Sequence, residues 1–442
     1  MNQEPGAWVE DEFAELDLGD PRRDRRAKSL LKRFSARPTA SIPDACEGWT
    51  ETVGAYRFLS NEEIEWSEMM QPHWARTAAR AGQFPVVLCL ADTTELDFNG
   101  QEIEGLGPLS YEMQRGMYLH ATYAVTPDRE PLGVVDAWMW ARELRDANGQ
   151  RGGIKESVRW IEGYERVAEQ AATLPGTRLV YVTDREGDMA ALMARAAELG
   201  HPADWLIRSQ HNRSLDESCR LWDRVEAGEV LGEITFILPG RAGRKAREVR
   251  QTLRAQRVKL PGSTGLEATC IVAQEIGAPA NVPPVVWRLL SNREARDTDA
   301  VTELIDWYRA RWEIEMFFHV LKNGCKVEAL QLAQMDRVER ALVLYMVVAW
   351  RIARLMRLGR TCPELDAALF FEADEIRGAY LLAKKARPTT PITLNQIIRL
   401  IASLGGFLGR KGDGEPGAKT LWIGMQRTMD AAFTIQALRD EG

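Results

Sequence analysis

The stretch PVVLCLAD (residues 85–92) is a continuous apolar run that ends in an aspartate. A second run of the same kind, RLVYVTD (residues 178–184), also ends in an aspartate. Short apolar runs of this length predict buried strands. Asp92 and Asp184 are therefore expected at the carboxyl ends of strands, where open α/β sheets place their ligands.

Other short runs extend this pattern along the chain. Further strands are predicted at 116–125, 131–140, 203–209 and 284–292, and helices at about 155–173 and 187–198. Strands that first follow one another and then alternate with helices predict a mixed α/β sheet. From about 213 to 284 the sequence changes to short strands separated by Gly and Pro turns, which predicts a β-rich insertion.

Both ends of the chain are predicted to be helical. Within the first 68 residues, helical spacing is kept by Ala27, Leu30, Leu31 and Phe34. Two apolar stripes near the other end consist of Leu394, Ile397, Ile398 and Ile401, and of Trp422, Met425, Met429, Phe433 and Gln436. Amphipathic helices at a chain end often pack on a second subunit. The sequence predicts three domains, 1–68, 69–358 and 359–442, with the insertion inside the second.

Composition narrows the class of protein. The chain has 442 residues, enough for several domains, and its 45% hydrophobic and 27% charged residues are ordinary for a globular protein. It contains no apolar run of membrane-spanning length, and its acidic start does not resemble a signal peptide. The six cysteines include no C-x-x-C pair, which argues against a zinc site and favours reduced thiols in the cytoplasm.

The charge is distributed unevenly along the chain. The net charge of −7 argues against nucleic acid as a partner, but residues 20–37 hold eight bases and two acids. Residues 241–259 hold eight bases and one acid. Basic blocks of this kind are typical of phosphate-binding surfaces, although a pair of solvated basic faces would give the same counts.

The stretch WYRARWEIEMFFHVLK (residues 307–322) has helical spacing and predicts one continuous helix ending at Gly324. At 100° per residue, four polar side chains fall within about 60° of one another: Tyr308, Arg311, Glu315 and Lys322. The apolar residues Ile314, Phe317 and Leu321 lie on the opposite side. A solvated surface helix scatters its charges more widely, so the stripe indicates a site.

Asp92, Asp184 and Glu315 form a candidate metal site. Carboxylate oxygens suit Mg²⁺ or Mn²⁺, and two such ions about 4 Å apart can activate a nucleophile and stabilise a leaving oxygen in phosphoryl transfer. Simpler interpretations remain open. Asp184 could cap the helix that follows it, and Arg311 could pair with Glu315 in a structural helix. No Walker A loop, G-x-G-x-x-G or G-x-S-x-G motif is present.

Taken together, these residues resemble one large group of bacterial cut-and-paste insertion-sequence transposases, the DDE enzymes. The signature of that group is Y-x₂-R-x₃-E-x₆-K, here Tyr308, Arg311, Glu315 and Lys322. Six further stretches are similar to the same group: LGDPRR (18–23), GAYRF (54–58), DTT (92–94), TDRE (183–186), IRS (207–209) and LGGF (404–407). The resemblance covers nearly the whole chain.

The resemblance implies a fold and a catalytic centre. The fold would be of class α/β, a ribonuclease H-like mixed sheet with a β-rich insertion, flanked by N-terminal and C-terminal helical domains. Asp92, Asp184 and Glu315 would be catalytic and would bind two Mg²⁺ ions, with Mn²⁺ expected to substitute. Water would cut one strand at the transposon end, and the freed 3′-OH would attack the opposite strand, forming a hairpin, or target DNA.

The resemblance also implies DNA contacts. The phosphate of the strand that is not transferred would be held by Tyr308, Arg311, Lys322 and Arg208. Trp287 would stack on a flipped base in a hairpin-forming enzyme, although an ordinary core tryptophan fits the same pattern. Recognition of the DNA end would use Arg22, Arg23, Arg26 and Arg57. Position 319 departs from the group, which often has Lys where this chain has His319.

The implied partners are the double-stranded DNA of the transposon ends and of the target, together with a second copy of the chain in a synaptic complex. No membrane is involved, and the expected location is the bacterial cytoplasm, on the nucleoid when DNA is bound. Two alternatives share many of these features. A ribonuclease H-like nuclease would cut without joining, and a non-catalytic repressor would be expected to have lost one of the three acids.

Overall fold

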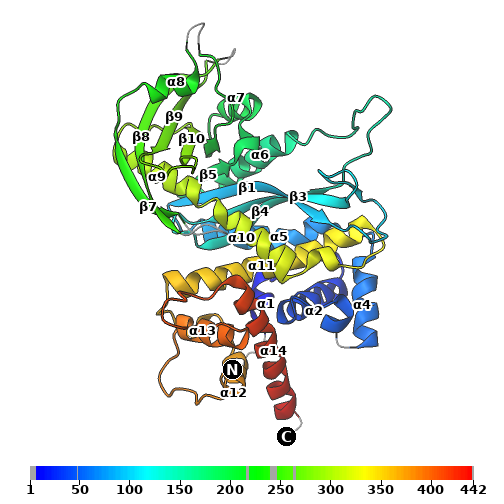
Figure 1. Cartoon of the computed structure of the whole chain (residues 1–442). Helices are drawn as coiled ribbons and strands as arrows, with labels where there is room; N and C mark the ends of the chain where they lie inside the picture. Colours follow the sequence, from blue (N-terminus) through cyan, green and yellow to red (C-terminus); the bar gives the residue numbers. More distant parts are fainter. Residues whose placement is uncertain (1–5, 47, 216–218, 239–245, 262–264, 441–442) are drawn as a thin grey trace. The chain divides into compact units, whose positions relative to one another are not determined.

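The computed structural model describes residues 6–46, 48–215, 219–238, 246–261 and 265–440 (Figure 1). They fall into two compact units, each described here by itself. Unit 1 comprises Met1–Ala81, Thr93–Gly153 and Glu313–Gly442, and unit 2 comprises Gly82–Asp92 and Ile154–Trp312. The three-domain division along the sequence stays a prediction.

The secondary structure follows the predicted order. The helices are α1 (Trp8–Glu12), α2 (Pro21–Ala36), α3 (Ile42–Cys46), α4 (Trp49–Leu59), α5 (Trp66–Ala81), α6 (Val158–Thr173), α7 (Ala190–Glu198), α8 (Leu221–Glu226), α9 (Thr298–Arg309), α10 (Trp312–His319), α11 (Met335–Thr361), α12 (Ala373–Leu382), α13 (Leu394–Leu404) and α14 (Ala418–Asp440). The strands are β1 (Val86–Asp97), β2 (Gly107–Pro108), β3 (Arg115–Val125), β4 (Pro131–Trp140), β5 (Arg178–Thr183), β6 (Asp204–Arg208), β7 (Gly232–Leu238), β8 (Arg247–Lys259), β9 (Glu267–Glu275) and β10 (Val286–Ser291). Short 3₁₀ or π segments are η1 (Arg185–Gly187), η2 (Val320–Gly324), η3 (Val327–Ala329) and η4 (Ala367–Leu369).

Unit 2 contains a mixed sheet with the strand order β1-β5-β6-β10-β9-β8-β7. The first three strands are parallel, and each later pair is antiparallel. The mixed α/β sheet is therefore confirmed. Strands β7, β8 and β9 form the predicted β-rich insertion, as long antiparallel neighbours rather than short strands.

Helices α6 and α7 pack together beside β5 in unit 2 (Figure 1). Tyr164 of α6 is fully buried, meets the Tyr181 ring of β5 edge-on and donates a hydrogen bond to the carbonyl of Ala203 at 2.8 Å. Tyr181 in turn donates to the carbonyl of Trp160 at 3.0 Å. These two phenols fix α6 on the sheet, because a buried hydroxyl without a partner would cost free energy.

Unit 1 is organised around α11, which contacts α2, α5, α13 and β4. Its side chains are apolar on most sides, which is the pattern of a helix buried in a core. Tyr345 stacks on Phe34 of α2 with ring centroids 4.8 Å apart, and the Trp350 indole donates to the carbonyl of Pro131 in β4 at 3.2 Å. None of the helices in the described ranges is long and apolar enough to cross a membrane.

A buried charged cluster joins α1, α5 and β4 in unit 1. His73 accepts a hydrogen bond from the backbone N–H of Val134 at Nε2, so its Nδ1 carries the proton and donates to Glu12 at 2.6 Å. Arg80 holds the same carboxylate through two bonds of 2.8 and 3.0 Å. Burial acts to raise the pKa of Glu12, but His73 and Arg80 outweigh it and lower that pKa to about 2.

The two C-terminal apolar stripes are buried inside the chain. Along α13, Leu394, Ile397, Ile398 and Ile401 are at most 2% exposed, and α13 packs on α11 and α14. Trp422, Met425 and Met429 of α14 are also buried. Phe433 and Gln436 of the second stripe are only half-buried. Most of both stripes is thus covered within the chain, α13 by α11 and α14, and α14 by α12 and α13.

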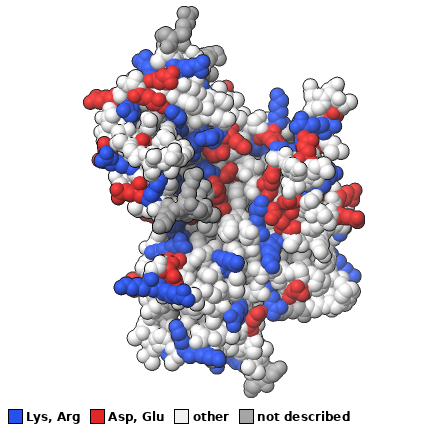
Figure 2. Space-filling model, viewed as in Figure 1, with Lys and Arg blue, Asp and Glu red and all other residues white. Residues whose placement is uncertain are grey.

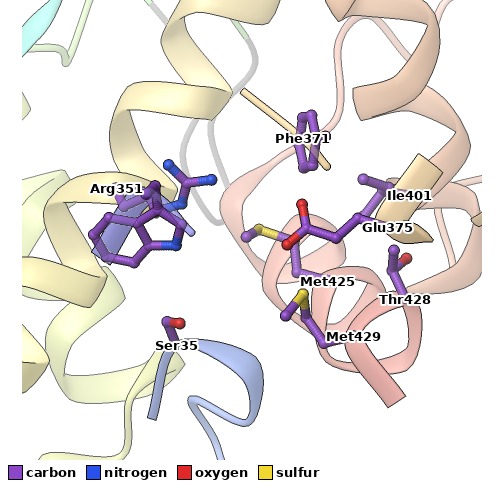
Figure 3. Close-up of a pocket in the computed structure, with 9 residues that line it drawn as sticks. Ser35, Arg351, Phe371, Glu375, Ile401, Met425, Thr428 and Met429 are labelled. Carbon is purple, nitrogen blue, oxygen red and sulfur yellow. The ribbon is translucent and has the colours of Figure 1, made fainter. Parts of the chain in front are cut away.

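A small cavity in unit 1 holds two buried charges (Figure 3). Figure 3 shows Arg351 on one side and Glu375, Met425 and Met429 on the other. Burial lowers the pKa of Arg351 to about 10, and its guanidinium donates to the carbonyl of Phe370 at 2.8 Å. The cavity volume of ≈ 20 Å³ is enough for about one water molecule.

We predict that Glu12→Gln destabilises the fold in a pH-dependent way. The pKa of Glu12 falls from 4.5 to about 2 on folding, so the ionised carboxylate stabilises the protein above pH 4.5 and loses that effect as the pH falls toward 2. The expected loss in the free energy of unfolding at pH 7 is about 3 kcal/mol, measured by denaturant titration.

Glu10→Gln on the same helix is the matched control. Glu10 is 68% exposed and pairs with Lys28, so the change should stay within about 0.5 kcal/mol. An equal loss for Glu12→Gln at pH 7 and at pH 2.5 would contradict the prediction.

Candidate active site

The register of the three parallel strands brings three predicted residues into one row. Ala91 of β1 pairs with Thr183 of β5, which pairs with Ile207 of β6. Each of these three residues is followed along the chain by one of the predicted site residues: Asp92 after Ala91, Asp184 after Thr183 and Arg208 after Ile207. Neighbouring strands lie about 4.8 Å apart, and in-register residues of parallel strands point to the same face. Two carboxylates and a guanidinium therefore lie side by side where β5 and β6 end. The expectation that the strand of Asp92 also ends there is wrong, because β1 continues to Asp97 beyond its pairing with β5.

Asp92 is bound by Arg311, another residue predicted for the site. Its Oδ2 accepts a hydrogen bond from Arg311 Nη1 at 2.6 Å, and the side chains are only 18% and 14% exposed. Arg311 lies in the two-residue turn between α9 and α10, and both residues belong to unit 2. The guanidinium therefore already supplies one positive charge to the row of acids.

Asp184 caps the short helix η1. Its Oδ1 accepts a hydrogen bond from the backbone N–H of Glu186 at 2.8 Å. Its other oxygen accepts no hydrogen bond from any residue that the structure describes. The capping interpretation is confirmed, and it leaves Oδ2 for another ligand.

The sequence did not single out Asp188, which supports the same edge of the sheet. Its side chain is fully buried, and Oδ2 accepts from the backbone N–H groups of Gln210 and His211 at 2.6 and 2.9 Å. Arg213 pairs with its other oxygen at 2.6 Å. Asp188 thereby fixes the loop that follows Arg208. The stretch TDREGD (residues 183–188) does contain this second aspartate, four residues after Asp184. An aspartate at that distance is equally typical of a turn, so the sequence did not mark it as part of a site.

Gly187 lies between these two aspartates, and its backbone packs so closely against Thr183 that no side chain fits there. A Cβ atom at this position would lie 2.2 Å from Thr183 Oγ1 and 2.6 Å from Thr183 Cβ, well inside any tolerated contact. The turn after β5 therefore folds back onto its own last strand residue only because residue 187 has no side chain. This packing sets the path of the backbone between Asp184 and Asp188.

We predict that Gly187→Ala displaces this turn and lowers DNA cleavage at least tenfold. The new methyl group must move Thr183 or the backbone beside Asp184, and overpacking of this kind costs about 1–3 kcal/mol. Gly176→Ala, where a Cβ would meet nothing within 4 Å, is the control and should retain activity. Equal cleavage rates for the two variants, measured on the same DNA, would refute this account.

The predicted continuous helix over 307–322 is wrong. Helix α9 ends at Arg309, a turn follows at 310–311, and α10 begins at Trp312. The N–H of Arg311 bonds to the carbonyl of Tyr308, three residues back, and after α10 the π segment η2 ends with Cys325 N–H bonded to the Val320 carbonyl. Because both irregularities change the rotation per residue, one straight stripe does not describe these four side chains.

Gly324 also has a different role from the predicted helix cap. It is the last residue of η2, and a Cβ atom there would lie 2.8 Å from the Trp422 ring. Its small size therefore permits close packing of η2 on α14.

Glu315 and Lys322 belong to unit 1. Glu315 is half-buried on α10, which is held in place by Phe317 stacked on Tyr123 at 4.6 Å and by a buried ion pair between Glu313 and Arg357 of α11. Burial raises the pKa of Glu313. Lys322 Nζ donates to the carbonyl of Glu95 in β1 at 2.7 Å, so it lies beside the part of β1 that follows the DTT motif.

The aromatic residues predicted to contact DNA are ordered in unit 2. Tyr308 is 6% exposed, and the guanidinium of Arg208 lies 5.9 Å from its ring centroid. Trp287 is half-buried and stacks on Phe236 of β7 with centroids 5.1 Å apart, while Arg309 covers the Phe236 ring at 4.8 Å. Trp287 is thus part of an aromatic and cationic stack rather than of the deep core.

The N-terminal arginines lie on α2 and α4, and most are paired with acids. Arg22 pairs with Asp20, Arg23 with Glu63, and Arg26 with Glu51. Arg57 is exposed on α4. Figure 2 shows basic and acidic residues interspersed over the visible face, so the local excess counted along the sequence is partly offset in space.

The second basic block is also partly neutralised. Arg241, Arg244 and Lys245 lie outside the described residues. In β8, Arg247 pairs with Glu275, Arg250 with Glu233 and Arg257 with Glu267. These cross-strand ion pairs stabilise the β-rich insertion and leave less charge for a phosphate than the composition suggested.

Three family models match this chain. A transposase DNA-binding model matches residues 5–64, a transposase DDE domain model residues 172–351, and a transposase Tn5 dimerisation domain model residues 347–438. The chain belongs to the Tn5-like DDE transposases. The DDE match includes Asp184 and Glu315, whereas Asp92 lies before it.

Among solved structures, this transposase is similar to the piggyBac transposase synaptic complex with hairpin DNA, determined by cryo-electron microscopy. The identity is 9%, the alignment covers 80% of this chain and 72% of the other, and the TM-score is 0.38. The family membership makes this transposase a DNA-binding, metal-dependent enzyme that forms dimers.

Proposed function

We propose that this transposase binds the terminal inverted repeats of its element, cuts the DNA ends and joins the freed 3′-OH to target DNA, with Asp92, Asp184 and Glu315 as the catalytic triad. The observation that supports the proposal is the strand register, in which Asp92 and Asp184 each follow the last residue pair of β1 and β5, Ala91 with Thr183. Glu315 comes from α10, within the matched DDE region.

The donor set fits a hard divalent cation. All three side chains are carboxylates, the ligands that Mg²⁺ and Mn²⁺ prefer, and no thiol or imidazole is among them. No group of three or more acidic, His or Cys side chains in the described ranges is close enough to form a metal site by itself. Two bound Mg²⁺ ions would activate the attacking oxygen and stabilise the leaving one.

Arg311, Tyr308, Lys322 and Arg208 are proposed to hold the DNA phosphate near the triad. Arg311 is paired with Asp92, but a guanidinium has five N–H donors and can bind a carboxylate and a phosphate together. Lys322 donates a hydrogen bond to the Glu95 carbonyl and pairs with the Glu328 carboxylate, so its ammonium group lies beside β1. These residues would orient the strand and offset its negative charge.

The Trp287 stack supports a hairpin intermediate. An extruded base next to an aromatic ring recovers about 1–3 kcal/mol of the stacking lost from the duplex. Phe236 stacks on Trp287 and is itself covered by Arg309, so the Trp287 ring is ordered before a base arrives. This arrangement favours hairpin formation on the opposite strand over direct double-strand cleavage.

DNA ends and a second protomer would be held by the terminal regions. Residues 5–64 include the predicted contacts Arg22, Arg23, Arg26 and Arg57, and target DNA would bind after synapsis. Since the apolar stripes are buried, the pairing surface is proposed to use exposed leucines of the dimerisation region: Leu365, Leu369, Leu381 and Leu408. A cytoplasmic location on the nucleoid fits these partners.

We predict that Asp92→Asn and Glu315→Gln abolish cleavage and strand transfer but spare binding to the DNA end. A metal ion contributes several kcal/mol to phosphoryl transfer, so cleavage should fall by about three orders of magnitude. The assay follows nicking, hairpin formation and joining of a duplex carrying the element's own end in Mg²⁺, with binding measured by gel shift.

Asp97→Asn on the same strand is the matched control. Asp97 accepts hydrogen bonds from Asn99 N–H and Gln114, and its variant should cut normally. Cleavage by Asp92→Asn at the wild-type rate would exclude the triad. Nicking by the wild-type protein without joining would instead identify a nuclease, and binding without nicking would identify a repressor.

We predict that Trp287→Ala reduces hairpin formation roughly tenfold or more while first-strand nicking continues, because only the second step needs the extruded base. Trp287→Phe keeps a stacking ring and should recover most of the yield. Denaturing gels of end-labelled DNA separate nicked strand from hairpin. A parallel loss of both products would show that Trp287 is structural.

A further inference from the structure

A second pocket lies on unit 2, directly beyond the row of Asp92, Asp184 and Arg208. Its volume is ≈ 220 Å³, and it is lined by Arg185, Arg208, Ser209, Gln210, Trp222, Val286 and Arg288. Arg185 follows Asp184 in the chain, and Arg208 is in register with Asp184 through Thr183 and Ile207. The pocket is therefore formed by the ends of β5 and β6 and the start of β10.

The lining of this pocket carries positive charge without an acid. Among the three arginines of the pocket, Arg288 is the one with an ionic partner in the part of the chain that the structure describes, Glu226 at 2.6 Å. Arg208 contacts only the Tyr308 ring, and Arg185 is exposed. Two guanidinium groups thus remain for an anionic ligand, and each offers paired N–H donors to oxygens.

The polar wall of the pocket is held rigidly. The N–H of Ser209 donates to the Arg288 carbonyl at 2.8 Å, and Ser209 Oγ accepts from the Trp222 indole at 3.0 Å. The N–H of Gln210 is bound by the buried Asp188. Because the Arg288 guanidinium also covers the Trp222 ring at 4.4 Å, the wall is ordered before any ligand arrives.

The size and the location of the pocket select the ligand. The volume of ≈ 220 Å³ exceeds the ~30 Å³ of one water several times but is below the ~300 Å³ of pockets for drug-sized molecules. A tetrahedral oxyanion fits both the space and the arginine donors. Since the pocket begins one residue after Asp184, a DNA strand bound at the triad would place a neighbouring phosphate at its opening.

We propose that this pocket binds one backbone phosphate of the DNA strand next to the cleavage point, through Arg185, Arg208 and the indole-supported wall of Ser209. The proposal rests on the proposed function, since it assumes DNA at Asp184, and it adds Arg185 and the polar wall beside α8 to the predicted phosphate contact of Arg208. The contact reads the backbone and not the base sequence.

The test is equilibrium binding of the full chain to the transposon-end duplex at several salt concentrations without divalent metal, followed by fluorescence anisotropy. Arg185→Ala should lower the slope of log Kd against log salt by about 1 and weaken binding about tenfold. Arg166→Ala, which removes an exposed charge from α6 in the same unit, is the matched control. Equal slopes for wild type and Arg185→Ala, or equal changes in both variants, would overturn the proposal.

A second measurement locates the phosphate on the DNA. Single methylphosphonate substitutions near the cleavage point each remove one negative charge. One position should weaken binding of the wild-type protein while having no further effect on Arg185→Ala or Arg185→Gln, and the absence of such a position would refute the site. If inorganic phosphate at constant ionic strength protects the wild type from thermal unfolding but not Arg185→Ala, the pocket takes free anions instead.

These readouts are independent of cleavage. If Asp92→Asn still cut DNA, the assignment of the catalytic triad would be wrong. The salt dependence of DNA binding by Arg185→Ala would still test whether the pocket binds a phosphate. If Asp92→Asn were inactive but every methylphosphonate position affected both proteins alike, the triad would stand and the phosphate pocket would fail.

Discussion

The parallel pairing of β1, β5 and β6 is the constraint on which the site depends. One register, Ala91 with Thr183 with Ile207, puts two acids and an arginine at the same height on neighbouring strands. A slip of one residue in any of these strands would turn its polar residue to the other face of the sheet. The buried apolar residues before each end prevent such a slip, so the packing of the core determines the chemistry at the edge.

The strand ends could be predicted because their signal is local. For β5 the apolar run also fixes where the strand stops, but β1 continues to Asp97, five residues beyond the end of its run. The prediction of one continuous helix around Glu315 was wrong, because a uniform rotation of 100° per residue does not include the turn at 310–311 or the π segment after His319. Each irregularity lies at a contact with a distant residue, Arg311 with Asp92 and Gly324 with Trp422, that no spacing rule contains.

Counting charges along the sequence also gave an incomplete prediction of the basic surfaces, because it does not show which arginines pair with acids from other elements. The basic block on α2 is real, but Arg23 and Arg26 are paired with Glu63 and Glu51, which lie in other elements. The buried C-terminal stripes show the same limit, because amphipathic spacing identifies an apolar face without identifying what covers it. Asp188 was missed for the opposite reason: its role lies in backbone N–H groups more than twenty residues away, which a motif does not display.

The Asp92–Arg311 pair has a consequence for how the protein exists between reactions. Two carboxylates on adjacent strands repel each other, and burial near a sheet edge strengthens the repulsion. A guanidinium at 2.6 Å from one of them offsets this cost from within the chain. This edge of the sheet therefore carries an internal counter-ion, which lets its acids stay ordered in the folded chain without a bound cation.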